Sequence, residues 1–559
     1  MIGLLDWLDA PEAQRGVRVA TPDSGWEFTP YTELQRDARW TAAQLLDLGV
    51  RRGDVVVLML GRERSFAAAF AGCLLAGATP CPVSTPLTFA SASGYVAHIA
   101  TILRAARPAV VLTDELLHVV AGEAAAAGAV PALVAQLAAP AGEPDAVERL
   151  RRAPGELALL QFTSGSSGTP KGVRVTWRNL EHNLSALHAF VDLQGDDAVA
   201  TWLPLYHDMG LVGTLLTPLT AGRDLWQLPP VEFLRAPERW LECFGVHGAA
   251  VTASPSFGFA YAARRVTEEQ LAGWDFSTWR QAIVGSDRVD HAALTRFTAL
   301  LAPHGFRATT FTPAYGLAES TLAVTGHPPG RPMTIVRLGD EPLRAGAPVE
   351  VRERATLGDA DADPDGGWIS ACGRPLGGAD VHVSDDDGRH LPDGHLGEIV
   401  IRSDSVADGY VGRGPFSGGR LATGDAGFLL DGELYVIGRN GDSLKVHGRN
   451  VYAEDVEAEL VRIDGIRAGR CAVIFGANPD HTAVALLEGE HTGWLDEVVR
   501  LLRRVTGPSV RIRVLTAARG TIERTSSGKP RRRVIWRALE AGELLAHTLY
   551  DSTQPEAAR

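Results

Sequence analysis

The sequence predicts an α/β fold in which a large N-terminal domain of layered α/β subdomains, completed by a β-rich subdomain, precedes a small α+β domain. Over the first four hundred residues, short β-branched runs alternate with stretches of helical spacing. From about residue 381 the pattern changes to strands separated by Asp-Gly pairs, and after residue 440 the charge becomes basic. Alternating strands and helices favour layered, largely parallel sheets. A chain of 559 residues has room for two or more domains with full-sized cores.

Local patterns predict the elements of the first part. Residues 55–60 (VVVLML) and 109–113 (AVVLT) predict buried strands because they are short, valine-rich runs. Residues 65–76 predict a helix that ends at Gly77. A later helix is predicted by apolar residues at helical spacing, namely Leu180, Leu184, Leu187 and Val191. Thr176, just before this helix, is a suitable N-cap.

Turn chemistry predicts the β-rich subdomain. Asp-Gly favours two-residue hairpin turns because both residues tolerate positive φ, and such pairs occur at 387–388, 393–394 and 431–432. Residues 398–401 and 434–437 are the strands expected between them. The acidic stretch 358–367 predicts a solvated surface loop.

The last part of the chain, residues 443–559, predicts the small domain. It carries 18 Lys and Arg against 15 Asp and Glu, whereas the rest carries 36 against 52. Its tail after Tyr550 is polar and is expected to be frayed.

Composition and charge exclude several classes of function. A net charge of −13 makes nucleic acid an improbable partner. The five cysteines have no CxxC spacing, which argues against disulfides or a zinc site and fits a reducing cytoplasm. The N-terminal segment MIGLLDWLDAPEAQ has no basic leader, and no window approaches the ~18 apolar residues of a membrane span. We therefore expect a cytoplasmic protein with no membrane span.

The segment QFTSGSSGTPKG, residues 161–172, is the first candidate site. It follows an apolar strand and is rich in small residues that can point N–H groups and hydroxyls at an anion. It is not a Walker A loop, because no GK[ST] occurs in it. Phosphate binding and a mobile linker are equally good interpretations of these residues alone. The candidate phosphate ligands are Thr163, Ser164, Gly165, Ser166, Ser167, Gly168, Thr169 and Lys171.

The stretch TSGSSGTPKGV resembles the phosphate-loop signature of the adenylate-forming (AMP-binding) superfamily, which includes acyl-CoA synthetases, peptide-synthetase adenylation domains, luciferases and fatty acyl-AMP ligases. Further segments match in the family's order. The match at residues 315–321 (YGLAEST) implies that Tyr315 and Gly316 contact adenine and that Glu319 coordinates Mg²⁺ on the phosphates of ATP. A carboxylate beside a triphosphate needs such a cation. Residues Gly285, Ser286 and Asp287 resemble the adenine-edge segment, with Ser and Asp where Ala and Glu are usual.

Two more matches imply a ribose site and a mobile domain. Thr423-Gly424-Asp425 and Gly438-Arg439 resemble the ribose-binding pair, in which Asp425 accepts from the ribose hydroxyls. The resemblance implies a large domain at 1–438, a hinge at 439–442 centred on Asp442, and a small mobile domain at 443–559. Residues 524–529 (RTSSGK) resemble the catalytic-lysine loop. On local evidence alone a surface turn in a basic patch is the better interpretation, but the place of the segment as the last of the ordered matches makes Lys529 the catalytic candidate.

The implied reaction is attack of a carboxylate on the α-phosphorus of ATP, giving an acyl-adenylate and pyrophosphate. Because two anions must approach each other, positioned cations and N–H donors lower the barrier. Lys529 is expected to contact the carboxylate and the α-phosphate. The small domain is then expected to turn about the hinge for transfer of the acyl group to a thiol.

The branch that the sequence resembles is that of the fatty acyl-AMP ligases. Residues 202–211 (WLPLYHDMGL) match that branch's motif and place the catalytic candidate His207 against the carboxylate and phosphates, with Asp208 beside it in a structural role. Residues Ser256, Phe257 and Gly258 resemble an acyl-pocket segment. Acyl-AMP ligases carry an insertion that is thought to restrain the small domain and disfavour CoA, and residues 330–354 are the candidate for it. KVHGRNVY (445–452) resembles a "GRN" turn of the same branch.

The acid is therefore expected to be fatty, and the acceptor to be the phosphopantetheine thiol of an acyl carrier protein. Carrier proteins are acidic, and a basic run could steer one: Arg503, Arg504, Arg511, Arg513, Arg531, Arg532 and Arg533. These arginines could equally serve only solubility. An acyl-CoA ligase and a non-catalytic nucleotide- or acyl-binding protein are the alternatives, and the motifs alone do not separate a luciferase-type oxygenase.

Overall fold

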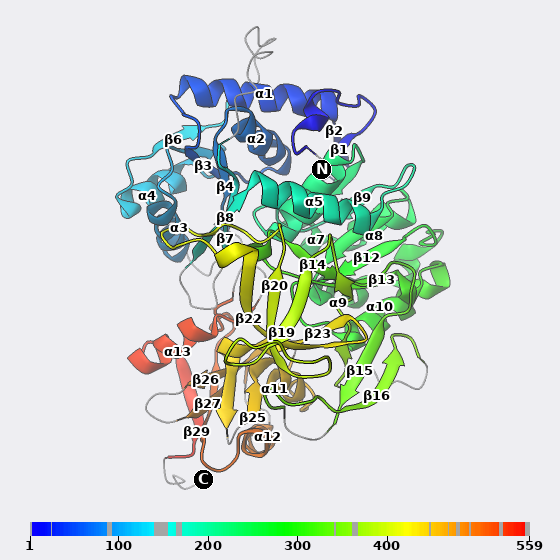
Figure 1. Ribbon diagram of the computed structural model, residues 1–559, viewed down its shortest axis with the longest axis vertical. Coiled ribbons are helices and arrows are strands. Elements are labelled where there is room, and N and C mark those ends of the chain that lie inside the picture. Colours follow the sequence, from blue (N-terminus) through cyan, green and yellow to red (C-terminus); the bar gives the residue numbers. More distant parts are fainter. Residues whose placement is uncertain are drawn as a thin grey trace.

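The computed structural model describes residues 3–23, 25–86, 92–138, 155–163, 170–339, 343–359, 367–446, 449–467, 469–476, 481–490, 493–524 and 529–553. Figure 1 shows a large upper part and a smaller lower part that carries the C-terminus. We keep the names large domain for residues 1–438 and small domain for residues 443–559. No helix in the described ranges combines the length and apolar character needed to cross a bilayer.

A mixed sheet forms the centre of the large domain (Figure 1). Its strands from β13 to β1 run parallel, and β2, β14 and β18 add antiparallel edges. Strand β11 is buried at all of its positions and β12 at all but one, as expected for parallel strands covered on both faces. In spatial order the strands are β18 (Arg374–Pro375), β14 (Ala323–Gly326), β13 (Phe311–Gly316), β12 (Gln281–Val284), β11 (Val251–Ser254), β9 (Val199–Thr201), β10 (Leu225–Gln227), β1 (Gly16–Ala20) and β2 (Trp26–Pro30).

The helices packed with this sheet bury an aromatic core. Trp240 and Trp279 are almost completely buried, and their ring centroids lie 5.7 Å apart. Phe297 packs edge-on against Trp279 with centroids 6.0 Å apart. The helices of this region are α5 (Trp177–Val191), the π-helix η4 (Met209–Leu216), α6 (Thr217–Thr220), α7 (Pro230–Arg235), α8 (Glu238–Gly245), α9 (Ser256–Arg265) and α10 (His291–Leu301).

A second, parallel sheet confirms the predicted strands near the N-terminus. The predicted strands 55–60 and 109–113 are β3 and β5, each one residue shorter than predicted, and the predicted helix 65–76 is α2, which starts two residues earlier and ends one residue earlier. Gly77 follows α2 with φ of +75°, as a helix-ending glycine requires. The sheet and its helices are β4 (Thr79–Pro82), β3 (Val55–Met59), β5 (Val110–Thr113), β6 (Leu133–Gln136), α1 (Tyr31–Asp47), α2 (Glu63–Leu75), α3 (Ala92–Ala106) and α4 (His118–Gly128).

Helix α5 has the predicted cap and apolar face. The Thr176 hydroxyl accepts from the backbone N–H of Asn179, whose side chain accepts in return from the N–H of Thr176. This capping box fixes the first turn of α5 directly after β8 (Lys171–Thr176). Strand β8 pairs on one side with β7 (Leu157–Thr163) and on the other with the short β21 (Gly409–Tyr410).

The β-rich subdomain follows the predicted turns. Its sheet has the order β19 (Asp380–Ser384), β20 (Gly397–Arg402), β22 (Arg420–Leu430) and β23 (Glu433–Arg439). Asp431 and Gly432 connect β22 to β23 with φ of 54° and 77°, as a type I′ turn requires. The predicted insertion 330–354 contributes β15 (Thr334–Leu338) and most of β16 (Val351–Thr356), which join β17 (Ile369–Ser370). Most of the predicted acidic loop lies outside the described residues.

The small domain is α+β, as predicted. In its main sheet β26 (Cys471–Gly476), β27 (Thr482–Glu488), β28 (Arg511–Ala517) and β29 (Ala546–Asp551) lie in that order. The other elements are β24 (Ser443–Val446), β25 (Arg449–Tyr452), α11 (Ala453–Leu460), α12 (Leu495–Thr506) and α13 (Arg532–Ala541). The prediction of a frayed tail from residue 551 is wrong at its start, because Asp551 ends β29 and accepts from Arg511 Nε at 3.0 Å.

The predicted basic run does not form one free positive surface. Arg511 and Arg513 pair with Asp551, Arg531 pairs with Glu523, and Arg504 pairs with Glu459. Arg532 is only 7% exposed, so its assignment to a docking surface is wrong. A buried guanidinium is held there by carboxylates of its own domain, a pairing that local sequence does not reveal.

Candidate active site

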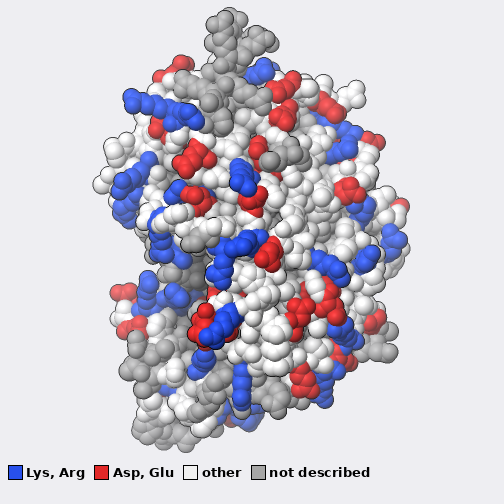
Figure 2. All heavy atoms as spheres, in the orientation of Figure 1, with Lys and Arg blue, Asp and Glu red and all other residues white. Residues whose placement is uncertain are grey.

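A cleft of about 1140 Å³ lies between the large and small domains. Figure 2 shows Lys and Arg side chains on both sides of a hollow on the left-hand flank, where the two domains meet. Among the described residues the cleft brings together most of the predicted site: Thr163, Lys171, His207, Gly285, Ser286, Asp287, Tyr315, Gly316, Glu319, Asp425, Arg439, Asp442 and Lys529. Residues 164–169 of the predicted phosphate loop lie outside the described residues.

The hairpin β22–β23 brings Asp425 and Arg439 together. Its two-residue turn alone would set Gly438 opposite Asp425, but the register shifts by one residue between Ala426 and Gly427. This bulge makes Arg439 the cross-strand partner of Asp425, and Arg439 Nε lies 3.2 Å from Asp425 Oδ1. The backbone directly before Asp425 is fixed by Glu398, whose Oε1 accepts from the N–H of Gly424 at 2.8 Å.

Tyr315, at the end of β13, completes this pair. Its hydroxyl donates to Asp425 Oδ2 at 2.7 Å, so both carboxylate oxygens of the 6%-exposed Asp425 are held. Burial, and then the Asp425 carboxylate, raises the pKa of Tyr315 well above its ordinary value. The phenol therefore stays a donor. Burial opposes charge on Arg439, but nearby carboxylates, Asp425 foremost, raise its pKa.

Strands β7 and β8 carry the two described ends of the phosphate loop. Thr163 ends β7 and is the register partner of Lys171, the first residue of β8. The Lys171 ammonium lies 5.1 Å from the ring centroid of Tyr410, within the range of a cation–π interaction. These two described ends, Thr163 and Lys171, are therefore held side by side at the cleft by strand pairing.

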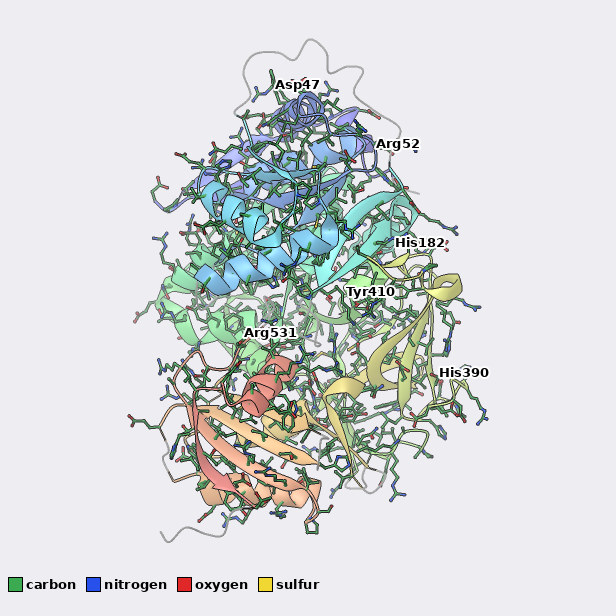
Figure 3. The ribbon with its side chains drawn as sticks, turned by 90° about the vertical axis from the view of Figure 1, so that its left-hand side faces the viewer. Asp47, Arg52, His182, His390, Tyr410 and Arg531 are labelled. Atoms are coloured by element: carbon green, nitrogen blue, oxygen red, sulfur yellow. The ribbon has the colours of Figure 1, made fainter. Side chains whose placement is uncertain are left out.

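Tyr410 is a residue of the cleft that the sequence interpretation missed. Its hydroxyl donates to Glu319 Oε1 at 2.7 Å while its ring contacts Lys171. Figure 3 shows Tyr410 at mid-height, between the upper part of the large domain and the small domain below. Only the pairing of β21 with β8 brings Tyr410 to Lys171, across more than two hundred residues of chain. No local signal in the sequence marks it.

Glu319 stands in a strained turn. Thr321, two residues later, is a β-branched residue with φ of 66°, and it is buried with its hydroxyl donating to Ser405 O at 2.7 Å. Such a conformation costs free energy and is stable only where the surroundings enforce it. The turn and the Tyr410 hydroxyl together fix the direction of the Glu319 carboxylate.

His207 lies where the chain enters the π-helix η4. Its Nδ1 is 2.7 Å from Asp208 Oδ1, which leaves Nε2 for another partner. The Asp208 carboxylate also accepts from the N–H of Met209 at 2.7 Å. Burial alone would lower the pKa of His207, but the charge and hydrogen bond of Asp208 outweigh it and raise that pKa. Asp208 therefore stabilises the protonated imidazole relative to an isolated histidine side chain.

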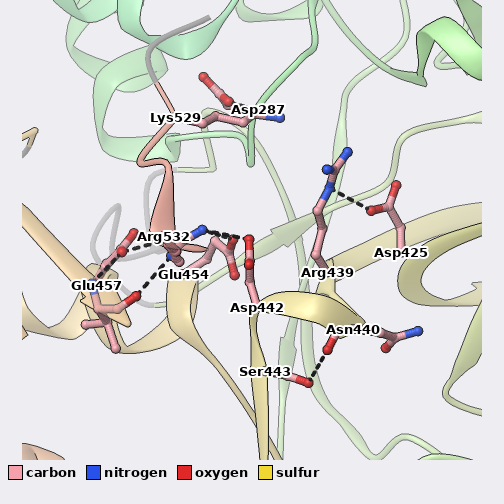
Figure 4. A network of polar contacts seen from close by, with 11 residues as sticks. Asp287, Asp425, Arg439, Asn440, Asp442, Ser443, Glu454, Glu457, Lys529 and Arg532 are labelled. Carbon is pink, nitrogen blue, oxygen red and sulfur yellow. Dashed lines mark hydrogen bonds and ion pairs between the residues drawn. The ribbon is translucent and has the colours of Figure 1, made fainter. Parts of the chain in front are cut away.

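The loop after β12 faces the small domain. Lys529 Nζ lies 3.5 Å from Asp287 Oδ1 in the cleft (Figure 4). The next residue, Arg288, forms an ion pair with Asp455 of α11. Ser286 adopts a positive φ of 72°, which a residue with a side chain rarely does without enforcement. Two consecutive residues of the large domain thus pair with two elements of the small domain.

The three predicted acyl-pocket residues are not among those that line the cleft. The Ser256 hydroxyl accepts from the N–H of Asp290, at the start of α10. Phe257 is 50% exposed and lies against Trp202, with ring centroids 6.3 Å apart. Gly258 is closely packed, because a side chain there would meet Ser254 Oγ at 2.2 Å. Ser256 and Gly258 hold α9 against its neighbours.

Magnesium is the metal that the motif implies. Among the described residues no group of three or more His, Cys, Asp and Glu is placed to bind a metal ion. Glu319 is a single oriented carboxylate in a cleft with Lys171 and Arg439. One carboxylate together with substrate phosphates and water is a common set of ligands for Mg²⁺, so the residues present fit that ion.

Comparisons with known proteins show the family of this chain. A model described as AMP-binding enzyme matches residues 8–411. Long-chain-fatty-acid–AMP ligase FadD26 of Mycobacterium marinum is 31% identical over 556 residues, which cover 91% of each chain. Medium-chain-fatty-acid–acyl-carrier-protein ligase JamA of Moorena producens is 31% identical over 535 residues, 90% of this chain and 88% of JamA. A Caulobacter vibrioides protein with a provisional acyl-CoA synthetase name is 33% identical over 525 residues, 90% of this chain and 89% of that protein.

Solved structures agree with the sequence relatives. A structure from a study of fatty acyl-adenylate ligases of E. coli and L. pneumophila has a TM-score of 0.83 and 28% identity, covering 97% of this chain and 98% of that chain. A fatty acyl-adenylate ligase of L. pneumophila in complex with acyl adenylate and pyrophosphate has a TM-score of 0.69 and 27% identity, covering 97% and 96%. The predicted superfamily and fold class are confirmed. The chain belongs to the AMP-binding enzyme family and is an adenylate-forming ligase.

Proposed function

We propose that the protein uses ATP to activate a fatty acid as its acyl-adenylate, releases pyrophosphate, and then transfers the acyl group to the phosphopantetheine thiol of an acyl carrier protein. One observation carries this proposal. Lys529 of the small domain lies in the same cleft as the Asp425–Arg439 pair, Glu319 and His207 of the large domain. A nucleotide held by the large domain would therefore meet a cation supplied by the small one.

Asp425 and Arg439 hold the ribose, with Tyr315 against the adenine and Gly285 to Asp287 along its edge. Asp425 is prearranged for this role, because Arg439 and Tyr315 each hold one of its oxygens and leave lone pairs for the ribose hydroxyls. Residues 163–169 and Lys171 hold the departing pyrophosphate. The cation–π contact with Tyr410 directs the Lys171 ammonium.

Lys529 and His207 act on the negative charge of the reacting carboxylate and phosphate groups. As the acid's carboxylate approaches the α-phosphorus, the Lys529 ammonium offsets the repulsion between the two anions. His207 donates a hydrogen bond from Nε2 to the carboxylate or a phosphate oxygen, because Asp208 holds Nδ1. Asp287 is a counter-ion of Lys529.

Glu319 would hold Mg²⁺ together with the phosphates, and Tyr410 keeps its carboxylate oriented. When bound, the ion supplies charge neutralisation of the triphosphate. The chain's own residues orient the reactants, supply the other cations and exclude water.

A fatty acid is favoured by the names of the relatives, which include a long-chain-fatty-acid–AMP ligase and a medium-chain-fatty-acid ligase. Each buried CH₂ contributes about 0.8 kcal/mol, so the depth of the acyl pocket sets the preferred chain length. Ser256, Phe257 and Gly258 are proposed for this pocket from their motif. They do not line the described cleft, and neither does Trp202, against which Phe257 lies.

Two observations favour a carrier protein as the acceptor. JamA is named as an acyl-carrier-protein ligase. The insertion 330–354 also reaches the small domain, where the N–H of Asn450 in the GRN turn donates to Leu343 O at 2.9 Å. That contact supports restraint of the small domain by the insertion. The second candidate, an acyl-CoA ligase, is favoured by the name of the Caulobacter relative.

The test is pyrophosphate release across a panel of carboxylic acids of increasing chain length, followed by mass spectrometry of a holo carrier protein or of free CoA. We expect release only with an acid present, and an acyl adduct on the carrier protein in excess of acyl-CoA. Lys529→Ala should slow release by roughly 10²–10³ or more, the scale of losing one positioned charge stabiliser. Arg389→Ala, which removes an exposed cation on a remote turn, is the control. Nucleotide binding without release for any acid would point to the non-catalytic alternative.

A further inference from the structure

Arg532 is a buried cation that the reaction as described does not use. It is the first residue of α13, three residues after Lys529, and all of its guanidinium nitrogens donate hydrogen bonds (Figure 4). Nε donates to Val473 O at 3.0 Å, and Nη2 donates to both oxygens of Glu457 at 2.9 Å. Nη1 donates to Asp442 Oδ2 at 3.0 Å and to Glu454 Oε1 at 2.9 Å.

The partners of Arg532 come from separate parts of the chain. Asp442 is the predicted hinge residue, Glu454 and Glu457 lie on α11, and Val473 lies on β26. A guanidinium can join these groups because its donors spread in a fixed fork, which an ammonium cannot match. Arg532 therefore ties the start of α13 to the hinge as well as to the core of the small domain.

The cluster around Arg532 carries more negative than positive charge, which is unusual for contacts that serve only to keep a domain folded. One cation faces three carboxylates, and Glu454 Oε2 is buried without a hydrogen bond from any described residue. Burial, only partly offset by Arg532, raises the pKa of Glu457 to about 7. Buried ionic clusters are weak stabilisers compared with apolar packing of the same volume. A contribution to stability therefore explains this cluster poorly. Fixing the direction of the chain at the start of α13 explains it better.

Asp442 also faces the nucleotide side of the cleft. It follows Arg439 by three residues. Burial lowers the pKa of Arg439, and the charge of Asp442, after those of Asp425 and Glu319, helps to raise it. Asp425 thus pairs with Arg439, and Asp442 pairs with Arg532 (Figure 4), while Asp442 acts on Arg439 only through its charge. Three residues of chain, which span at most about 11 Å, then connect Arg532 to Lys529.

We infer that Arg532 is a positioning residue for the adenylation step: it fixes the base of the Lys529 loop to the hinge residue Asp442, so that Lys529 reaches the cleft. The inference rests on the proposed role of Lys529. Arg532 itself is among the residues that line the cleft, but in this proposal it touches no reacting atom and acts through the lysine. The alternative is a brace that only keeps the small domain folded.

The experiment measures two half-reactions in single and double variants. One is pyrophosphate release from ATP and acid, and the other is transfer of the acyl group from supplied acyl-adenylate to a holo carrier protein. The variants are Arg532→Lys, Lys529→Ala and the double variant. Arg532→Lys keeps the positive charge but loses the forked set of guanidinium donors. Arg537→Lys makes the same change at an exposed site on the same helix and is the control.

If Arg532 acts through Lys529, Arg532→Lys lowers the turnover of pyrophosphate release by about 10- to 100-fold, a share of the effect of losing the stabiliser itself. The KM for ATP and the transfer half-reaction stay within about threefold. The double variant is no slower than Lys529→Ala alone, because residues that act as one unit are not additive. Hydrogen exchange in peptides spanning residues 529–541 becomes faster, while the central sheet of the large domain is unchanged.

The inference is overturned if the two half-reactions fall together in Arg532→Lys, or if the double variant shows the product of the two single losses. Should Arg532→Lys fail to fold, Asp442→Asn replaces it in the same cycle, since asparagine keeps the size and backbone freedom of the hinge residue. Lys529→Ala separates the two proposals: normal pyrophosphate release in that variant refutes the proposed function, whatever Arg532→Lys does.

Discussion

Asp425→Asn tests the ribose site with the smallest possible change. Asparagine has the same shape as aspartate but one acceptor oxygen and one NH₂ group in place of two acceptor oxygens. Arg439 Nε, at 3.2 Å, can only donate, so it will face the remaining oxygen. The NH₂ group then turns to the Tyr315 hydroxyl at 2.7 Å, which can rotate to accept. The fold of the hairpin is preserved, and one acceptor for the ribose hydroxyls is lost together with the charge.

A hydrogen bond to a charged group contributes about 1.5–3 kcal/mol. Asp425→Asn should therefore weaken ATP binding about 10- to 150-fold, since each 1.4 kcal/mol is a factor of ten. Isothermal titration calorimetry with ATP measures this directly. Asp431→Asn is the matched control, because it makes the same change in the turn of the same hairpin, outside the cleft. An affinity within twofold of the unaltered protein would refute the ribose assignment of Asp425.

Three further predictions concern the cleft and the core. Tyr410→Phe keeps the ring beside Lys171 but removes the hydrogen bond to Glu319, so the Mg²⁺ concentration that half-saturates pyrophosphate release should rise about tenfold. Calorimetric titration of Mg²⁺ into the complex with a non-hydrolysable ATP analogue should show the same weakening. An unchanged Mg²⁺ affinity in both assays would contradict this role of Tyr410. Burial lowers the pKa of His207, but Asp208 foremost, with Asp287 adding to and Lys529 opposing the effect, raises it above 6.5. Protonated His207 therefore stabilises the fold fully below pH 6.5 and loses this contribution as pH rises through the raised pKa. Pyrophosphate release should fall as pH rises through the same pKa, and His207→Gln should abolish that limb of the pH profile. Trp240→Ala should lower the free energy of unfolding by about 3–5 kcal/mol in urea titration, because Trp240 is fully buried among aromatic rings, and a loss below 1 kcal/mol would contradict the packing described.

Local chemistry was sufficient to predict the elements whose structure depends on near neighbours. The Asp431-Gly432 turn needs only two residues that tolerate positive φ, and the capping box of α5 needs only Thr176 and Asn179. The strands at 55–60 and 109–113 are marked by apolar runs that no exposed segment would carry. The cleft residues were found through the motifs of the family, and the fold brings together those that lie in the described ranges.

What remained hidden depends on contacts between distant segments. Tyr410 reaches Glu319 and Lys171 only because β21 pairs with β8. The bulge beside Ala426 moves the register by one residue, and the hairpin turn does not predict it. The sequence around Arg532 does not distinguish it from a surface arginine. Only the fold surrounds it with Asp442, Glu454 and Glu457. Each of these features is decided by tertiary packing rather than by propensity.

The central claim is that the nucleotide and the acid meet in the cleft, between the Asp425–Arg439 pair of one domain and Lys529 of the other. A crystal structure with a non-hydrolysable acyl-adenylate analogue tests it most directly. We predict ribose hydroxyls within hydrogen-bond distance of Asp425, and Lys529 Nζ released from Asp287 to bond the oxygens that join the acyl group to the phosphate position. An analogue bound outside the cleft, or a Lys529 that stays on Asp287 beyond reach of the analogue, would contradict the claim.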